Sequence, residues 1–344
     1  MVGGKGGRCL AGVEKAGSVV GKVEKGQPMR KVVNVIQDQP RSRGKFTGLC
    51  GELRVSIEVV SGLHVGSGQL PIKVDEEALR KEADLWPVEE LAQTIELDYL
   101  SFPMVEGKAV IPGSSVKGNV RARLELSFKE KNRRFRSCFT ETGNFGSWRH
   151  YQIWEVSVTQ NRIVPRLKGR GSQCQFVRGK LERVCLLCDL FGTTGLAGLL
   201  EFSDFTLSNG RISPNEFPHG MQLLVAGAGS IFTGKVKFAN LKPEELGLVL
   251  WGMGLRENRI GREVLMGRLK YAGPIGKVKY RLDTLKLSRF SEPLRLGSVV
   301  INSDSEMRAD DGLVKELVNM ARRAYGEELE DVDEVARLNQ LVKR

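Results

Sequence analysis

The sequence predicts an α+β protein, in which a sheet carries large insertions and ends in a helical C-terminal region. Strand and helix patterns do not alternate strictly along the 344 residues, which disfavours a doubly wound parallel sheet. Two segments, about 50–128 and 197–255, each combine strands with a following helix and are loosely related. The tail, about 305–344, carries apolar residues at helical spacing.

The composition is that of a globular protein with an acidic partner. Hydrophobic residues make up 41% of the chain and charged residues 27%, and the length suggests one or two domains. The net charge of +12 favours nucleic acid as the first candidate partner and an anionic membrane surface as the second. The simplest alternative is that the charge only keeps the protein soluble. No apolar run of about 18 residues and no signal-peptide core occur, so we expect a cytoplasmic protein without a membrane-spanning helix.

Residues 1–48 form a basic, glycine-rich N-terminal segment that either folds on RNA or stays a disordered tail. The next segment predicts a half-buried strand, because Leu53, Val55 and Ile57 alternate with polar residues. This strand runs into Gly62–Gly68, where glycines let backbone approach a ligand closely. His64 lies within this turn and is either a ligand contact or a structural histidine.

Residues 75–94 have helical spacing and indicate a helical excursion between two strand regions. Asp98 follows in a short connection. An aspartate in such a place is most simply a cap or turn residue.

The stretch 109–124 predicts an anion site. Ala109–Ile111 is apolar and extended, Pro112-Gly113 turns the chain, and Ser114 or Ser115 is a good N-cap for a helix that continues through Phe128. Free backbone N–H groups and the positive helix end would then lie beside basic residues, which suits phosphate. We expect these basic residues to share one helix face; they are Lys117, Arg121 and Arg123. The alternative is an ordinary strand-to-helix connection with a solvated basic face.

Residues 137–194 mix aromatic and basic residues, Arg166 and Lys168 among the latter, which suits single-stranded nucleic acid or a local aromatic core. The spacing of Cys185 and Cys188 is typical of zinc ligands, although two thiolates do not close a tetrahedral site. We therefore expect a structural zinc held by four cysteines: Cys138, Cys174, Cys185 and Cys188. His150 could replace either Cys138 or Cys174 in this set. No His-Glu pairing indicates a catalytic zinc, and a redox role would need a thioredoxin-like context.

The later part of the chain predicts a strand near 199–204, a strand-turn unit over 225–236 and an apolar helix over 241–253. Pro243 and the two glutamates after it suit the first turn of that helix. Residues 256–279 are basic and glycine-rich, but they lack the GxxxxGK[ST] pattern, which disfavours nucleotide binding.

Three motifs resemble the RAMP superfamily of CRISPR proteins, in the same order along the chain. They are Gly62-Leu63-His64-Val65-Gly66-Ser67-Gly68, Ile111-Pro112-Gly113-Ser114-Ser115-Val116-Lys117-Gly118, and Cys188-Asp189-Leu190-Phe191-Gly192 through Phe202-Ser203-Asp204. The resemblance covers about residues 50–285. Within the superfamily the chain looks most like the crRNA-binding backbone subunit of the type III-A Csm interference complex.

The resemblance implies a ferredoxin-like (RRM-like) core over 49–136 and 195–300, with a helical insertion at 70–97. A zinc-binding insertion at 137–194 and C-terminal helices at 301–344 complete the expected organisation. It also implies a protein that binds crRNA along its length without sequence specificity, self-associates along the RNA and meets other Csm-type subunits. Asp98 matches the place of the family's catalytic aspartate, which would cleave target RNA with Mg²⁺.

His64 and Lys117 match the family's guide-RNA contacts. Together with the basic and hydroxyl residues around the motifs they give the expected RNA-binding set: His64, Ser114, Ser115, Lys117, Arg121, Arg123, Arg166, Lys168 and Arg268. The glycine-rich segment around Met266-Gly267-Arg268 has fewer consecutive glycines than the family usually carries. This departure, the long insertions and the cysteines leave a non-catalytic capping or Cmr-type subunit as an alternative.

A stand-alone RNA-processing endoribonuclease is the rival from another class. Such enzymes usually depend on histidine acid–base chemistry, for which this chain offers three histidines: His64, His150 and His219.

Overall fold

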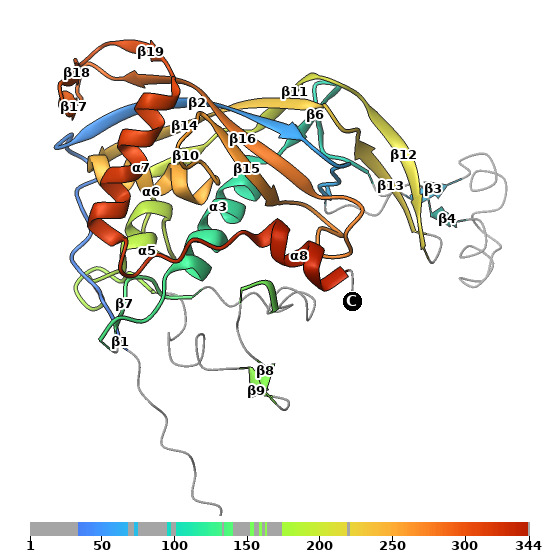
Figure 1. Cartoon of the computed structure of the whole chain (residues 1–344), viewed down its shortest axis with the longest axis horizontal. Helices are drawn as coiled ribbons and strands as arrows, with labels where there is room; N and C mark the ends of the chain where they lie inside the picture. The colour runs from blue at the N-terminus through green and yellow to red at the C-terminus, as the bar shows by residue number, and fades with distance from the viewer. Residues whose placement is uncertain are drawn as a thin grey trace, which may run out of the picture. The chain divides into compact units, whose positions relative to one another are not determined.

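The computed structural model describes residues 34–67, 72–74, 95–97, 101–132, 134–139, 152–154, 158–159, 162–163, 174–218 and 221–342. All of them belong to one compact unit, which begins at Val32. The described residues form a mixed structure with a large antiparallel sheet and several helices, as an α+β protein should have (Figure 1).

The large sheet has nine strands in the order β15-β16-β2-β14-β11-β6-β5, with β10 on β14 and β19 on β16. Every pairing within it is antiparallel. Its strands are β2 (Leu49–Val59), β5 (Met104–Val105), β6 (Lys108–Ile111), β10 (Leu200–Phe202), β11 (Phe205–Asn209), β14 (Ile231–Leu241), β15 (Ile260–Leu265), β16 (Lys277–Leu287) and β19 (Glu306–Arg308).

The described residues also form five separate two-stranded sheets. They are β1 (Asn34–Val35) with β7 (Arg134–Phe135), β3 (Ile72–Val74) with β4 (Ile95–Leu97), β8 (Val158–Thr159) with β9 (Arg162–Ile163), β12 (Ile212–Phe217) with β13 (Met221–Ala226), and β17 (Leu294–Leu296) with β18 (Val299–Ile301). The helical excursion expected at 75–94 lies outside the described residues, between β3 and β4.

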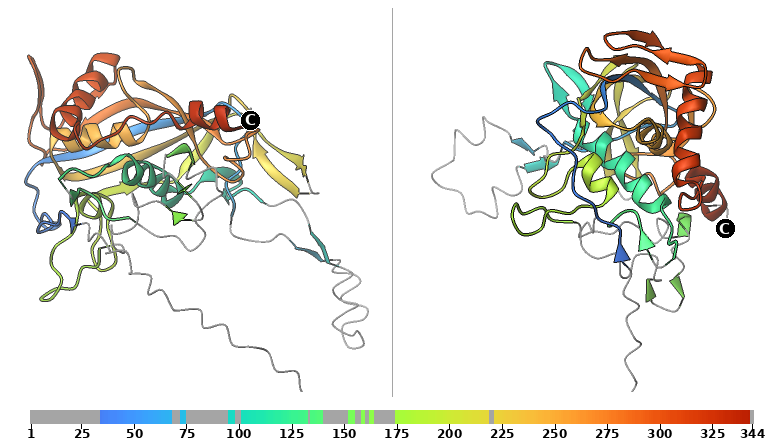
Figure 2. Two further views of the ribbon diagram at one scale, coloured as in Figure 1. Left: turned by 60° about the horizontal axis from the view of Figure 1, so that its bottom comes forward. Right: turned by 90° about the vertical axis from the view of Figure 1, so that its left-hand side faces the viewer.

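Five helices are described: α3 (Gly113–Ser127), α5 (Leu186–Phe191), α6 (Pro243–Gly252), α7 (Asp311–Tyr325) and α8 (Glu334–Val342). The alternation predicted for β2 holds, because Leu53, Val55 and Ile57 are buried in one apolar core with residues of α3, α6 and α7. Figures 1 and 2 show these helices packed beside the sheet. Helix α6 begins at Pro243 with two glutamates in its first turn, as the sequence predicts.

The helices of the tail also follow the predicted apolar spacing. Asp310 caps α7 by accepting a hydrogen bond from the Leu313 N–H. Helix α8 packs on β15. None of the described helices combines the length and the apolar character that crossing a membrane requires.

Candidate RNA interface and metal centre

The turn between β6 and α3 has a different cap from the one that the sequence predicts. Helix α3 begins at Gly113, so that Pro112 is the N-cap, and neither Ser114 nor Ser115 caps it through its side chain. Instead, the Asp204 carboxylate accepts a hydrogen bond from the Gly113 N–H at 2.8 Å. A side chain at Gly113 would overlap the Phe202 carbonyl oxygen. Gly113 of the motif is therefore explained by close packing against residues 202–204, where β10 leads into β11.

Val116 of the motif is buried in the core, whereas its polar neighbours lie toward solvent. Ser114, Ser115 and Gly118 are exposed, and Lys117 is half-buried. Partial burial and repulsion from Arg121 lower the pKa of the Lys117 ammonium, while Glu201 opposes this shift. Because its charge is incompletely balanced in the protein, Lys117 is suited to bind an anion.

The three basic residues of α3 do not share one exposed face, contrary to the prediction. Arg121 donates to the Gly192 carbonyl at 2.7 Å, pairs with Glu125 and lies 3.3 Å from the Cys188 Sγ atom. Arg123 is buried, with 4% of its surface exposed, and forms an ion pair with Glu334 at 2.8 Å.

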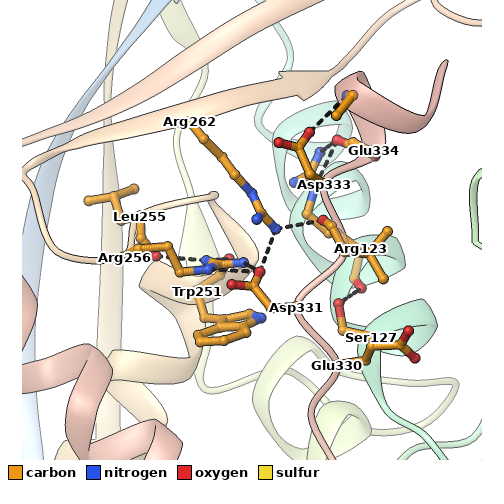
Figure 3. A network of polar contacts seen from close by, with 12 residues as sticks. Arg123, Ser127, Trp251, Leu255, Arg256, Arg262, Glu330, Asp331, Asp333 and Glu334 are labelled. Atoms are coloured by element: carbon orange, nitrogen blue, oxygen red, sulfur yellow. Dashed lines mark hydrogen bonds and ion pairs between the residues drawn. The ribbon is translucent and has the colours of Figure 1, made fainter. Parts of the chain in front are cut away.

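The partners of Arg123 belong to a polar network that holds the C-terminal segment against the body of the protein (Figure 3). In this network Asp331 pairs with both Arg256 and Arg262. The contacts of Arg123 are thus made within the protein, on the side of α3 that meets α8 and β15.

His64 is fully buried instead of lying at the surface. Its Nδ1 atom is 2.7 Å from the Leu224 carbonyl oxygen, and its ring meets Phe102 edge-on. The Nε2 atom is buried and has no hydrogen-bond partner. Burial lowers the pKa of His64, and the Arg268 charge lowers it further against the effect of the Leu224 hydrogen bond. The surroundings of His64 therefore disfavour its charged form and leave its Nε2 atom without a partner among the described residues.

The loop between β15 and β16 lies directly against the His64 turn. The Arg268 N–H donates to the His64 carbonyl at 2.9 Å, and the Gly276 N–H donates to the Gly62 carbonyl at 2.7 Å. Gly267 has a φ of +83°, and a Cβ there would overlap the His64 carbonyl oxygen, so only glycine permits this approach. The Arg268 side chain remains exposed.

Asn119 joins α3 to β15 and β16, a role that the sequence analysis missed. Its side chain donates to the Leu265 carbonyl at 2.8 Å and accepts from the Tyr280 hydroxyl at 3.1 Å. The β15–β16 loop is thus bonded to the 62–67 turn, and α3 is bonded to the β15 residue directly before that loop.

Four cysteines come together as predicted, and they can hold a metal ion such as zinc. Cys138, Cys174, Cys185 and Cys188 are all buried, and their Sγ atoms lie within 4.8 Å of one another. The Sγ atom of Cys138 is 3.3 Å from that of Cys188 and 3.6 Å from that of Cys185. Tetrahedral zinc with bonds of about 2.3 Å separates its sulfur ligands by about 3.8 Å. The cluster therefore has the size of a zinc site.

The surroundings of the cluster also suit thiolates. Gln37 donates to the Cys174 Sγ atom, the Cys138 N–H donates to that of Cys185, and Arg121 donates to that of Cys188, each at 3.3 Å. Hydrogen bonding among the thiols lowers the pKa of Cys174 and Cys188 and raises that of Cys138 and Cys185. Cys185 caps α5 and Cys188 lies within it, so the helix presents both thiols to one centre.

Four of the predicted site residues lie outside the described residues: Asp98, His150, Arg166 and Lys168.

A family model of the RAMP superfamily matches residues 56–302, which is more than half of the chain. The chain belongs to the RAMP superfamily. This membership indicates a CRISPR-associated RNA-binding subunit, since RAMP proteins typically bind CRISPR RNA and other Cas subunits. Comparison with curated proteins found no match.

Proposed function

We propose that this RAMP protein is the crRNA-binding backbone subunit of a type III effector complex. One observation carries the proposal: hydrogen bonds join the β15–β16 loop to the His64 turn, and Asn119 of α3 bonds to Leu265, the β15 residue directly before that loop. These segments present Ser114, Ser115, Lys117 and Arg268 at or near the surface. Each of these side chains suits RNA phosphates or ribose hydroxyl groups.

Such a surface binds RNA without reading its sequence. Lysine, arginine and serine side chains contact phosphate and 2′-hydroxyl groups, which every nucleotide carries. A guide whose sequence varies requires contacts of this kind. Arg121 and Arg123, whose contacts lie within the protein, act on RNA indirectly in this proposal by fixing α3.

The strand order supports a ferredoxin-like core. A βαββαβ fold needs two helices and four antiparallel strands. The segments β2, α3, β10, β14, α6 and β16 occur in that order along the chain, and their strands lie in the order β16-β2-β14-β10. We assign the core to 49–136 and 195–300, and treat 70–97 and 137–194 as insertions and 301–344 as an added helical region.

We propose structural zinc for the four-cysteine cluster, which would tie the 137–194 insertion to the core. Zinc supplies four strong bonds to thiolates there, and Arg121 offsets part of their charge. We also propose that the protein self-associates into a filament along crRNA and contacts other Csm-type subunits.

Replacing Lys117 tests the RNA interface. Binding of full-length protein to a uniform single-stranded RNA is measured by fluorescence anisotropy over a series of salt concentrations. We expect Lys117→Ala to weaken binding about 10-fold, as for the loss of one charged hydrogen bond of about 1.5 kcal/mol. The slope of log K against log salt should fall by about 1.

Lys315→Ala is the matched control, because Lys315 is exposed on α7 and its loss removes the same charge. Equal effects of the two substitutions would mean that RNA binding depends only on the net charge of the protein, which would contradict the proposed interface.

Target-RNA cleavage with Mg²⁺ through Asp98 is a separate proposal. Assembled complex carrying Asp98→Ala should bind target RNA as before and lose cleavage, whereas undiminished cleavage excludes Asp98 from the reaction. A non-catalytic capping or Cmr-type subunit predicts no cleavage even with Asp98 intact. Metal-independent cleavage of precursor repeat RNA by the isolated protein would instead support the stand-alone endoribonuclease.

A further inference from the structure

Two exposed phenylalanine rings stack on one another away from the proposed RNA interface. Phe46 precedes β2 and Phe290 follows β16, and their ring centroids are 5.1 Å apart with an angle of 7° between the planes. Phe46 is 58% exposed and Phe290 is 52% exposed. A stacked pair of this exposure leaves a large aromatic surface in water, which in soluble proteins often marks a binding site.

The backbone beneath Phe46 is held by a buried side chain. Asn240 is only 3% exposed. Its side chain accepts from the Thr47 N–H at 2.7 Å and donates to the Lys45 carbonyl at 2.7 Å, which are the groups on either side of Phe46. The exposed ring is thus carried by a fixed loop.

The loop that carries Phe290 is held by hydrogen bonds to residues 48–50, at the start of β2. The Ser288 N–H donates to the Cys50 carbonyl at 2.8 Å, and the Glu292 N–H donates to the Gly48 carbonyl at 3.1 Å. The Cys50 N–H donates in turn to the Ser291 hydroxyl at 3.0 Å. Because Asn240 holds the Phe46 loop and residues 48–50 hold the Phe290 loop, the stack is organised before any partner arrives, which reduces the entropy lost on binding.

Basic residues accompany both rings. Lys45 immediately precedes Phe46, Arg289 immediately precedes Phe290, and both basic residues are exposed. The Arg289 guanidinium lies 4.6 Å from the centroid of the Phe290 ring. Within residues 42–48 and 288–292 the single carboxylate is that of Glu292. Exposed aromatic rings flanked by cations suit single-stranded nucleic acid, whose bases stack while its phosphates are neutralised.

We propose that Phe46 and Phe290 form a stacking platform for an unpaired base of single-stranded RNA. The platform lies where Gly51 pairs with Leu287, and the proposed interface lies beyond the other end of the same strands, where Val59 pairs with Val278. Along β2, eight residue steps separate Gly51 from Val59, so the two positions are about 27 Å apart. The platform is therefore a second RNA contact, and it rests on the proposed function.

The test compares Phe46→Ala/Phe290→Ala with Phe46→Tyr/Phe290→Tyr in the full-length protein. Affinity for oligouridine and oligoadenosine is measured by anisotropy over a salt series. We expect the alanine variant to bind about 5- to 100-fold more weakly, as for the loss of one stacked base. The salt slope should stay the same, since no charge is removed, and the tyrosine variant should bind as the unchanged protein does.

The outcomes separate this proposal from the proposed function. If Lys117→Ala weakens RNA binding but Phe46→Ala/Phe290→Ala does not, the stacking platform is wrong and the proposed RNA interface stands. If the alanine variant keeps its RNA affinity and instead changes the sedimentation coefficient, the rings serve a protein contact and the platform is also overturned. A tyrosine variant as weak as the alanine variant excludes stacking. Thermal unfolding controls for folding, and only a small fall in melting temperature is expected for the alanine variant, because each ring is about half exposed and its main contact is the other ring.

Discussion

At the scale of single residues, neighbouring basic side chains of α3 have different surroundings. Lys117 is half-buried at the edge of the proposed interface, Arg121 contacts the cysteine cluster, and Arg123 is buried against Glu334. The sequence predicted one shared face because the spacing within a helix does not reveal which partners lie opposite. Those partners, Cys188 and Glu334, come from distant parts of the chain and are set by the tertiary fold.

The cysteine cluster gives the first residue-scale prediction. Cys185→Ser should lower the metal content of protein purified without added metal from about one zinc per chain to well below one. It should also lower the melting temperature, since binding to a site formed only in the folded state stabilises that state. Metal analysis and calorimetry check both.

Cys50→Ser is the matched control. Cys50 is a buried thiol outside the cluster, and it contacts the Gly48 carbonyl oxygen. Its replacement should leave the metal content unchanged. Equal metal loss in the two variants would contradict the assigned ligands.

His64 gives a prediction for pH dependence. Its pKa in the folded protein lies below the ordinary value of 6.5, so between these two pKa values the unfolded chain binds more protons than the folded protein. The contribution of His64 to the free energy of unfolding is therefore complete above pH 6.5 and is lost as the pH falls through the folded pKa. Each unit of pKa depression corresponds to about 1.4 kcal/mol.

His64→Asn keeps a donor for the Leu224 carbonyl and cannot titrate. Denaturant unfolding between pH 5 and 7 should therefore show a smaller loss of stability for this variant than for the unchanged protein. Identical pH profiles would show that His64 does not titrate as described.

At the scale of elements, α8 is fastened at its first residue. The Glu334 Oε1 atom accepts from Arg123 of α3 (Figure 3). It also accepts from the Leu265 N–H of β15 at 2.6 Å, so Glu334 ties α8 to both elements. Asp333, just before the helix, is exposed and accepts from the Ala336 N–H at 2.9 Å. Two adjacent carboxylates thus have different roles, one inside the protein and one as a local cap.

Removing each carboxylate should separate these roles. Glu334→Ala leaves Arg123 buried without its partner and should lower the free energy of unfolding by about 3–5 kcal/mol. Asp333→Ala removes only the cap and should lower it by about 1 kcal/mol. Denaturant titration measures both values. A loss of 1 kcal/mol or less for Glu334→Ala would mean that the buried pair does not hold α8.

Elements with a local signal were predicted well. The alternation of β2 and the proline and glutamates of α6 are visible within one segment, because they depend on burial period and helix-end chemistry. The cap of α3 was predicted wrongly, since Asp204 reaches Gly113 from another part of the sheet. The stack of Phe46 on Phe290 had no signal either, because it forms only when β2 pairs with β16.

At the scale of the whole molecule, the fold brings the His64 turn, α3 and the β15–β16 loop together. Hydrogen bonds join the loop to the His64 turn, and Asn119 of α3 bonds to the β15 residue directly before the loop. The motif order could be found in the sequence, and so could the superfamily. Their convergence, the burial of His64 and the closure of the four-cysteine cluster required the fold.

The central claim is that RNA runs along the proposed interface. The most direct test is photo-crosslinking of the full-length protein to a uniform single-stranded RNA that contains 4-thiouridine, followed by mass-spectrometric mapping of the linked peptides. We predict crosslinks within 62–67, 113–118 and 266–276, all weakened by added salt. Crosslinks that spare all three segments, or that persist unchanged at high salt, would contradict the account.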